Sequence, residues 1–274
     1  MQLLSRFFNF YLDASIHVAL AVVSLYEVSA IILKSSTNWF LLGFLFFGTI
    51  VCYNFIKYGV EAKKYLIVSN PYHKAIQVFS FFAFGFAVYF FFQLSKEIWL
   101  TIMILMGVSV LYAIPLLPKA KNLRSLGGAK TFLVALVWMG TTVLLPTIDN
   151  QLEVNWDIGV LLTQRFLLVL ILLLPFEIRD MDYDKPELRT LPQRVGVKKT
   201  KMLGYILTLG YFLICFLKDE FNTTEVFCKL LVSTLLLIVL ILTRKKQHIY
   251  FSSFWVELIP MLFLGMFYFM NWIV

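Results

Sequence analysis

The sequence predicts an all-α integral membrane protein, a polytopic bundle that forms one domain over residues 1–274. The composition is 60% hydrophobic and 15% charged, whereas soluble domains are about 45–50% apolar and about 25% charged. Apolar runs recur along the whole chain, and each is close to the roughly 20 residues that cross a bilayer. These runs are continuous rather than alternating, which favours helices over a closed barrel. A soluble globular enzyme and a disordered chain are therefore excluded.

The apolar runs divide the chain into nine predicted spans with short loops between them. This leaves little length for a separate soluble domain. The runs cover residues 14–33, 39–56, 75–94, 97–115, 131–148, 158–176, 203–217, 226–243 and 250–273.

The basic residues alternate between the loops. Of the 24 Lys and Arg residues, 19 lie in the N-terminal segment and in the loops after the second, fourth, sixth and eighth spans. Basic residues collect on the cytoplasmic side of a membrane, so we expect a cell-membrane protein with its N-terminus in the cytoplasm and its C-terminus outside. The net charge of +8 then needs no nucleic-acid partner.

An acidic stretch follows the sixth predicted span. At 100° per residue, Glu177, Asp180 and Asp184 share one helical face, whereas Asp182 points about 160° away from Asp184. Three carboxylates on one face repel each other unless a cation lies among them, and oxygen ligands favour Mg²⁺. A solvated loop neutralised by neighbouring basic residues is the alternative interpretation.

This stretch carries a family resemblance. Glu177-x-x-Asp180-x-x-x-Asp184, followed by Arg189-Thr190-Leu191-Pro192 and Val195-Gly196, resembles the second aspartate-rich motif of the UbiA prenyltransferase family, with Glu in place of the first Asp. The resemblance implies nine helices around a central cavity, with Mg²⁺ as cofactor. It makes Glu177, Asp180 and Asp184 the metal ligands and Asp180 and Asp184 catalytic residues, with Arg189 in support.

The first aspartate-rich motif of the family is degraded in this chain. Between the second and third predicted spans, the best register places Asn54, Lys57 and Glu61 at the acidic positions, with the same spacing and on one helical face. We expect Asn54 and Lys57 to contact a diphosphate, with Lys57 as a catalytic residue that supplies charge in place of a metal. Glu61 would support them.

A basic patch follows the fourth predicted span. Tyr112 and Pro115 precede Lys119, Lys121 and Arg124, and this order is similar to a diphosphate-binding segment of the family. We expect the three basic residues to bind diphosphate oxygens, with Tyr112 in support. Plain positive-inside charge is the alternative interpretation of the patch.

The resemblance implies an intramembrane enzyme that transfers an isoprenoid chain from a prenyl diphosphate to an aromatic or other lipophilic acceptor. Two alternatives remain: a non-catalytic relative that binds an isoprenoid or quinone-like lipid, and a small-molecule transporter. The acids lie at a helix end rather than at mid-span, which disfavours the transporter. Arg165, inside the sixth predicted span, either faces a cavity or extends to the interface.

The alternation of basic loops predicts the side on which the chain ends. A reporter fused after Val274 should be active only outside the cytoplasm, because nine spans with a cytoplasmic N-terminus place the C-terminus on the other side. A cytoplasmic reporter signal would contradict the nine-span count.

Overall fold

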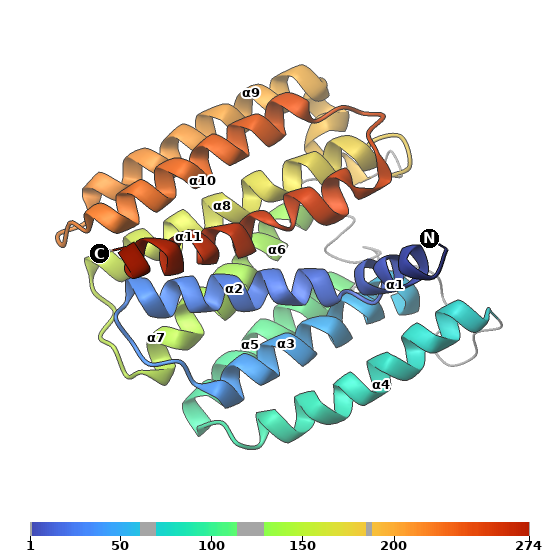
Figure 1. Ribbon diagram of the computed structural model, residues 1–274, viewed down its shortest axis with the longest axis horizontal. Coiled ribbons are helices and arrows are strands. Elements are labelled where there is room, and N and C mark those ends of the chain that lie inside the picture. Colours follow the sequence, from blue (N-terminus) through green and yellow to red (C-terminus); the bar gives the residue numbers. More distant parts are fainter. Residues whose placement is uncertain (1, 61–69, 114–128, 185–187, 274) are drawn as a thin grey trace.

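Helices make up every regular element of the described residues in the computed structural model, which are 2–60, 70–113, 129–184 and 188–273. The helices lie roughly alongside one another in a bundle (Figure 1). In chain order the elements are α1 (Gln2–Asp13), α2 (Ile16–Ile32), α3 (Trp39–Asn54), η1 (Phe55–Val60), α4 (Pro71–Phe91), α5 (Lys96–Ala113), α6 (Ala129–Met139), η3 (Gly140–Leu144), α7 (Leu145–Asp149), α8 (Trp156–Asp180), α9 (Leu191–Leu213), η5 (Ile214–Leu217), α10 (Thr223–Leu242), η6 (Phe251–Val256) and α11 (Ile259–Ile273).

Most of these helices have the length and composition of membrane spans. Within the described ranges, seven are long and apolar enough to cross a bilayer, and there are eight if α1 and α2, bent by 57°, count as one span. The chain is therefore an integral membrane protein, as the composition predicts. Helix α5 is not among the seven, so the count of nine stays a prediction.

Two of the spans contain a stretch of π-helix shortly before a proline. Pro146 and Pro260 have no N–H to donate to the carbonyl four residues earlier, so the regular ladder cannot continue through them. The wider turns η3 and η6 precede these prolines. Such turns are frequent at functional sites, and η3 packs against α2 and α8 near the middle of the bundle.

Helix α8 is the most buried span, and it packs against α6, α9 and α10. Within it, Arg165 is 2% exposed. Its guanidinium donates to the Leu25 carbonyl at 2.7 Å and to the Ser29 hydroxyl at 2.9 Å, both on α2. Arg165 therefore points into the bundle and links α8 to α2, so it does not extend to the membrane interface.

A second buried polar group joins α8 to α10. The Lys229 ammonium donates to the Glu225 carboxylate and to the Gln164 side-chain oxygen. Lys218 donates to the same carboxylate at 2.8 Å. Lys229 lies inside α10, where a carboxylate one turn away compensates its charge.

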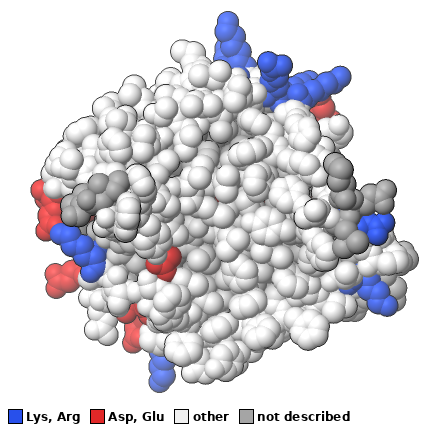
Figure 2. Space-filling model, viewed as in Figure 1, with Lys and Arg blue, Asp and Glu red and all other residues white. Residues whose placement is uncertain are grey.

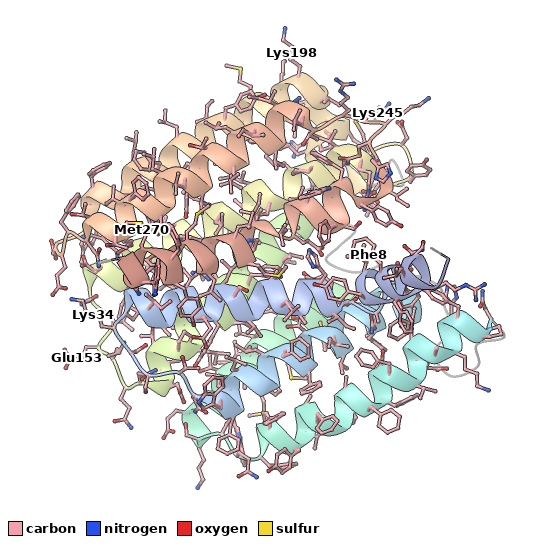
Figure 3. All side chains as sticks on the ribbon, viewed as in Figure 1. Phe8, Lys34, Glu153, Lys198, Lys245 and Met270 are labelled. Atoms are coloured by element: carbon pink, nitrogen blue, oxygen red, sulfur yellow. The ribbon has the colours of Figure 1, made fainter. Side chains whose placement is uncertain are left out.

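The two ends of the bundle differ in charge. Lys and Arg gather at one end of the visible face, whereas most of the visible Asp and Glu lie at the other (Figure 2). Lys198 and Lys245 mark the first end, and Lys34 and Glu153 mark the second (Figure 3). The end that carries Lys57, Arg179, Lys198 and Lys245 is called the basic end below.

Close packing at Gly204 gives a test of the fold. A Cβ on Gly204 of α9 would lie 2.9 Å from side-chain carbons of both Leu174 and Leu240, whereas one on Gly210 would meet no atom within 4 Å. Gly204→Leu should destabilise the protein by about 1–3 kcal/mol through overpacking. Thermal unfolding in detergent should show a lower Tm for Gly204→Leu than for the matched control Gly210→Leu. Equal Tm values would contradict the α8–α9–α10 packing.

Candidate functional site

The acidic stretch begins where α8 ends at the basic end. Helix α8 stops at Asp180, and the Asp184 N–H still donates to the Asp180 carbonyl at 2.8 Å, so the chain makes another helical turn. Asp182 points elsewhere, because its carboxylate forms an ion pair with Lys245 at 2.7 Å. Asp182 is thus engaged by a basic residue, and its separation from the other three acids stays a prediction.

Each of the other three carboxylates has different surroundings. Glu177 is buried, and its carboxylate accepts a hydrogen bond from the Thr131 hydroxyl on α6. Asp180 accepts two hydrogen bonds from Arg179, at 2.7 and 3.0 Å. Asp184 has one buried oxygen, Oδ2, to which no described group donates. This buried Asp184 oxygen is therefore open to a further donor or to a cation.

The backbone around Asp184 is fastened to the start of α9. The Gln193 amide donates to the Asp184 carbonyl at 2.9 Å and to the Met181 carbonyl at 3.2 Å. Its oxygen accepts from the Thr190 N–H at 3.0 Å, just before the first helical turn. Gly196 has φ of 81°, a left-handed conformation that glycine adopts without strain, and the helix kinks there. The backbone of the acidic stretch at Met181 and Asp184 is consequently held by hydrogen bonds from Gln193 in the first turn of α9.

The predicted metal ligands do not converge in this structure. Among the described residues, no three His, Cys, Asp or Glu side chains lie together in a way that would hold a metal ion. The donor set nevertheless fits Mg²⁺ in its chemistry, since all the candidate ligands are carboxylates. The Asp184 oxygen without a donor also fits, because a cation would satisfy it.

In the first motif segment, Asn54 fastens the corner between α1 and α2. Its side-chain oxygen accepts from the Ser15 hydroxyl at 2.7 Å, and its amide donates to the Ala14 carbonyl at 3.1 Å and the Ser80 hydroxyl at 2.9 Å. Ser15 has φ of 61°, so this bend is a strained one. Both amide donors of Asn54 are thus engaged within the protein.

Lys57 lies on η1 at the basic end and is half-exposed. Its ammonium is 3.5 Å from the Asp13 carboxylate and 3.3 Å from the Asp13 carbonyl. The other carboxylate oxygen of Asp13 accepts from the Tyr72 hydroxyl at 2.8 Å, and Tyr58 donates to the Asp13 carbonyl at 3.0 Å. Asp13 therefore remains anchored by two tyrosines if Lys57 turns away.

The remaining predicted site residues are Arg189, which the structure describes, and five whose side chains lie outside its described part. Arg189 is exposed, in a left-handed backbone conformation with φ of 42°. The backbone of Tyr112 belongs to α5, but its side chain is outside the described part. The residues outside the described ranges altogether are Glu61, Lys119, Lys121 and Arg124.

Glu257 is a residue of this region that the sequence analysis misses. It lies at the break between η6 and α11, and the charges of Lys57 and Arg179 both act on its carboxylate. Lys57 comes from the first motif segment and Arg179 from the second, so one basic residue of each segment acts electrostatically on this carboxyl. An acid inside the last apolar run, three residues before Pro260, is the sequence signal for it.

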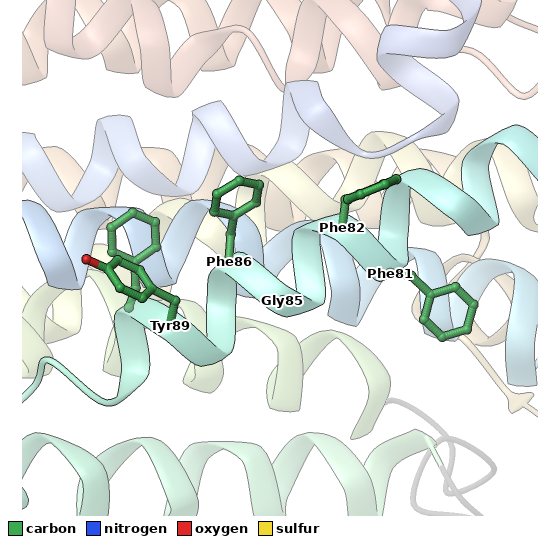
Figure 4. A pocket seen from close by; sticks show the side chains of 6 residues that line it. Phe81, Phe82, Gly85, Phe86 and Tyr89 are labelled. Atoms are coloured by element: carbon green, nitrogen blue, oxygen red, sulfur yellow. The ribbon is translucent and has the colours of Figure 1, made fainter.

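An apolar groove lies elsewhere, on the outward side of α4 (Figure 4). Aromatic side chains line it, and it contains no carboxylate or basic group, so it lacks the means for acid, base or metal chemistry. Its lining residues are Phe81, Phe82, Gly85, Phe86, Tyr89 and Phe90. This groove is separate from the predicted central cavity, which remains a prediction.

Comparison with known proteins supports the fold. No family model and no curated protein matches the chain. Among solved structures, a UbiA homolog from Aeropyrum pernix K1 in its apo form is 10% identical, with a TM-score of 0.66 over 93% of this chain and 98% of that chain. A UbiA homolog from Archaeoglobus fulgidus bound to DMAPP and Mg²⁺ is 11% identical, with a TM-score of 0.62 over 97% and 100% of the two chains.

A third solved structure, of digeranylgeranylglyceryl phosphate synthase, is 16% identical, with a TM-score of 0.55 over 96% of this chain and 97% of that chain. The chain thus has the fold of these UbiA homologues over nearly its whole length. The UbiA-like fold predicted from the sequence is confirmed.

The different surroundings of the acids predict different effects on metal binding. With Mn²⁺ as a paramagnetic probe, Asp180→Asn and Asp184→Asn should each weaken binding at least about tenfold if these acids bind the metal as the sequence predicts, because each would remove an anionic oxygen. Asp182→Asn should change it less than about twofold, since Asp182 is paired with Lys245. Equal losses in all three variants, measured by electron paramagnetic resonance, would contradict the separation of Asp182 from the other acids.

Proposed function

We propose that this chain, which shares its fold with UbiA homologues, is a member of that family and acts as an intramembrane prenyltransferase. One observation carries the proposal: the chain has the fold of UbiA homologues over nearly its whole length, and it carries two segments that resemble the family's paired motifs. Similar structures are bound to DMAPP or GPP together with Mg²⁺. A prenyl diphosphate is accordingly the proposed donor substrate, and a lipophilic molecule is the proposed acceptor.

The proposed reaction begins when the bond between C1 of the prenyl chain and the diphosphate oxygen breaks, and the electron pair leaves with the diphosphate. Cationic groups lower the barrier by stabilising this departing charge. Lys57 is proposed to do so directly, together with Lys119, Lys121 and Arg124 from the basic patch. Bound Mg²⁺ would add further positive charge at the phosphate oxygens.

The acids are proposed to hold the metal. Glu177, Asp180 and Asp184 would be its ligands, with Asp184 Oδ2 the oxygen most in need of a partner. Arg179 neutralises Asp180 in the present arrangement. Glu61, Tyr112 and Arg189 are proposed to support the site. Asn54 supports it through the α1–α2 corner that it fastens.

The orientation follows the positive-inside rule. With the basic end in the cytoplasm of a cell membrane, the site would open toward soluble prenyl diphosphates, and the prenyl chain would extend toward the apolar interior. The N-terminus would be cytoplasmic and the C-terminus outside.

A non-catalytic lipid-binding protein is the second candidate. It is favoured by Lys57, which stands where the family has a carboxylate and is engaged by Asp13. Such a protein would bind prenyl diphosphates without releasing diphosphate from them.

The experiment that tests the proposed function uses purified protein with labelled dimethylallyl, geranyl and geranylgeranyl diphosphates. Diphosphate release that requires Mg²⁺ and stops with EDTA is the expected result. Mg²⁺-dependent binding without release would favour the second candidate, and absence of both would contradict the two proposals together.

Lys57 gives a sharper test of how the first motif works. Lys57→Ala should weaken geranyl diphosphate binding about 10²-fold, because a charge-assisted contact in a partly desolvated site is lost. Extra Mg²⁺ should not restore the affinity. Lys57→Asp should instead make binding more dependent on Mg²⁺.

The matched control is Lys198→Ala, which removes the same charge from an exposed position at the same end. Titration of geranyl diphosphate into each variant provides the measurement. If Lys57→Ala binds as tightly as Lys198→Ala, Lys57 has no part in diphosphate binding.

A further inference from the structure

Two of the three cysteines lie on the hairpin that α9 and α10 form. Cys215 is in η5, directly after α9, and Cys228 is in the second turn of α10. Both are buried, at 2% and 0% exposed, and both thiols are free in this structure. The loop that joins the two helices carries Glu220, whose carboxylate pairs with Lys34 at 3.4 Å. The two cysteines therefore lie toward the end of the bundle that Lys34 marks, opposite the basic end (Figure 3).

Contacts along the hairpin fix its register. Near the connecting loop, the Lys218 ammonium pairs with the Glu225 carboxylate at 2.8 Å. Several turns away, a Cβ on Gly204 would lie 2.9 Å from a side-chain carbon of Leu240. Gly204 lies 14 residues before Lys218, and Leu240 lies 15 residues after Glu225. The two antiparallel helices, which run side by side in Figure 1, thus keep one register within a single residue.

This register places the two cysteines opposite each other. Cys215 lies three residues before Lys218. Cys228 lies three residues after Glu225, which is the ion-pair partner of that lysine. Each cysteine is thus almost one turn from the ion pair, at the same level of the hairpin. Both thiols also act electrostatically on one group, the Tyr211 hydroxyl.

The spacing of packed helices suits a disulfide at facing positions. Helix axes pack about 8–10 Å apart, and Cα atoms lie about 2.3 Å from each axis. Directly facing Cα atoms are therefore about 3.5–5.5 Å apart, and a small offset along the helices gives the range of about 4.4–6.8 Å found in disulfides. Two buried thiols that only fill space are the alternative.

The orientation proposed above separates the three cysteines by compartment. With the basic end in the cytoplasm, Cys215 and Cys228 lie toward the outer side, where disulfides form and persist. Cys52 lies near the end of α3 that continues into η1, which carries Lys57 of the basic end. The chain thus contains its own control, because Cys52 lies toward the side where thiols stay reduced.

We propose that Cys215 and Cys228 form a disulfide that joins the end of α9 to the start of α10 in the mature protein. The oxidant is a disulfide-bearing thiol oxidant of the outer compartment. One cysteine thiolate attacks the oxidant disulfide, and the second displaces the oxidant from the resulting mixed disulfide. The oxidant leaves as a dithiol that carries the two electrons and the two protons. Because both thiols are buried in the folded chain, this exchange takes place before the hairpin packs against α8.

Thiol trapping in cells tests the modification. Cells that express the protein are quenched with trichloroacetic acid, and the precipitate is dissolved in SDS with N-ethylmaleimide, so that every free thiol is blocked. Dithiothreitol and a maleimide-linked polyethylene glycol then label only the thiols that were oxidised. The wild-type protein should gain two labels, and Cys52→Ser should also gain two. Cys215→Ala and Cys228→Ala should gain none, and mass spectrometry without reductant should find the two peptides linked.

Thermal unfolding in detergent measures the effect of the cross-link. A disulfide that closes a short loop restricts the unfolded chain. Adding dithiothreitol should therefore lower the Tm of the wild-type protein by at least about 5 °C. The matched control is the double variant Cys215→Ala/Cys228→Ala, whose Tm should not respond to dithiothreitol.

Two outcomes would overturn the proposal. Three free thiols in the quenched cells would leave Cys215 and Cys228 as packing residues, and a disulfide that involves Cys52 would contradict the register. A cross-linked protein whose Tm ignores the reductant would exclude the stabilising effect. The reporter after Val274 tests the proposed orientation separately, and the assay of diphosphate release tests the proposed function, so the failure of either is distinguishable from the failure of the disulfide.

Discussion

Charged and polar groups inside the bilayer must find their partners within the protein, and this requirement shapes the bundle. Arg165 meets it by bonding across to Leu25 and Ser29 on α2, and Lys229 meets it through Glu225 and Gln164. These contacts connect α8 to helices on both sides. Because α8 also carries the acidic stretch at its C-terminal end, its fixed position determines where those carboxylates lie relative to η1 and η6.

At the basic end the same requirement is met only in part. Three acids, Asp13, Asp180 and Asp182, each have a basic partner. One oxygen of Asp184, Oδ2, has no donor among the described groups. A bound cation at this oxygen would supply the partner that it lacks.

The sequence predicts those features that depend on local periodicity. Composition and apolar runs predict the membrane-spanning helices, whereas the shared face of Glu177, Asp180 and Asp184 stays a prediction. Features that depend on tertiary partners are missed. Helix α9 begins at Leu191, whereas the predicted span begins at 203. The prediction starts late because it follows apolar residues, and the first turns of α9 are polar and basic. The role of Arg165 depends on its hydrogen-bond acceptors on α2, which the sequence alone does not identify. The position of Glu257 depends on where η6 ends and α11 begins, which the apolar run does not indicate.

The Arg165 contact also bears on how the protein is assembled in the membrane. Lys229 has a carboxylate one turn away on its own helix, so α10 can enter the bilayer as a nearly neutral segment. The described acceptors of Arg165 lie on another helix. Since chains are made from the N-terminus, α2 is already present when α8 leaves the ribosome. The buried cation therefore meets its acceptors on arrival, and deletion of α2 would leave α8 a poor substrate for membrane insertion.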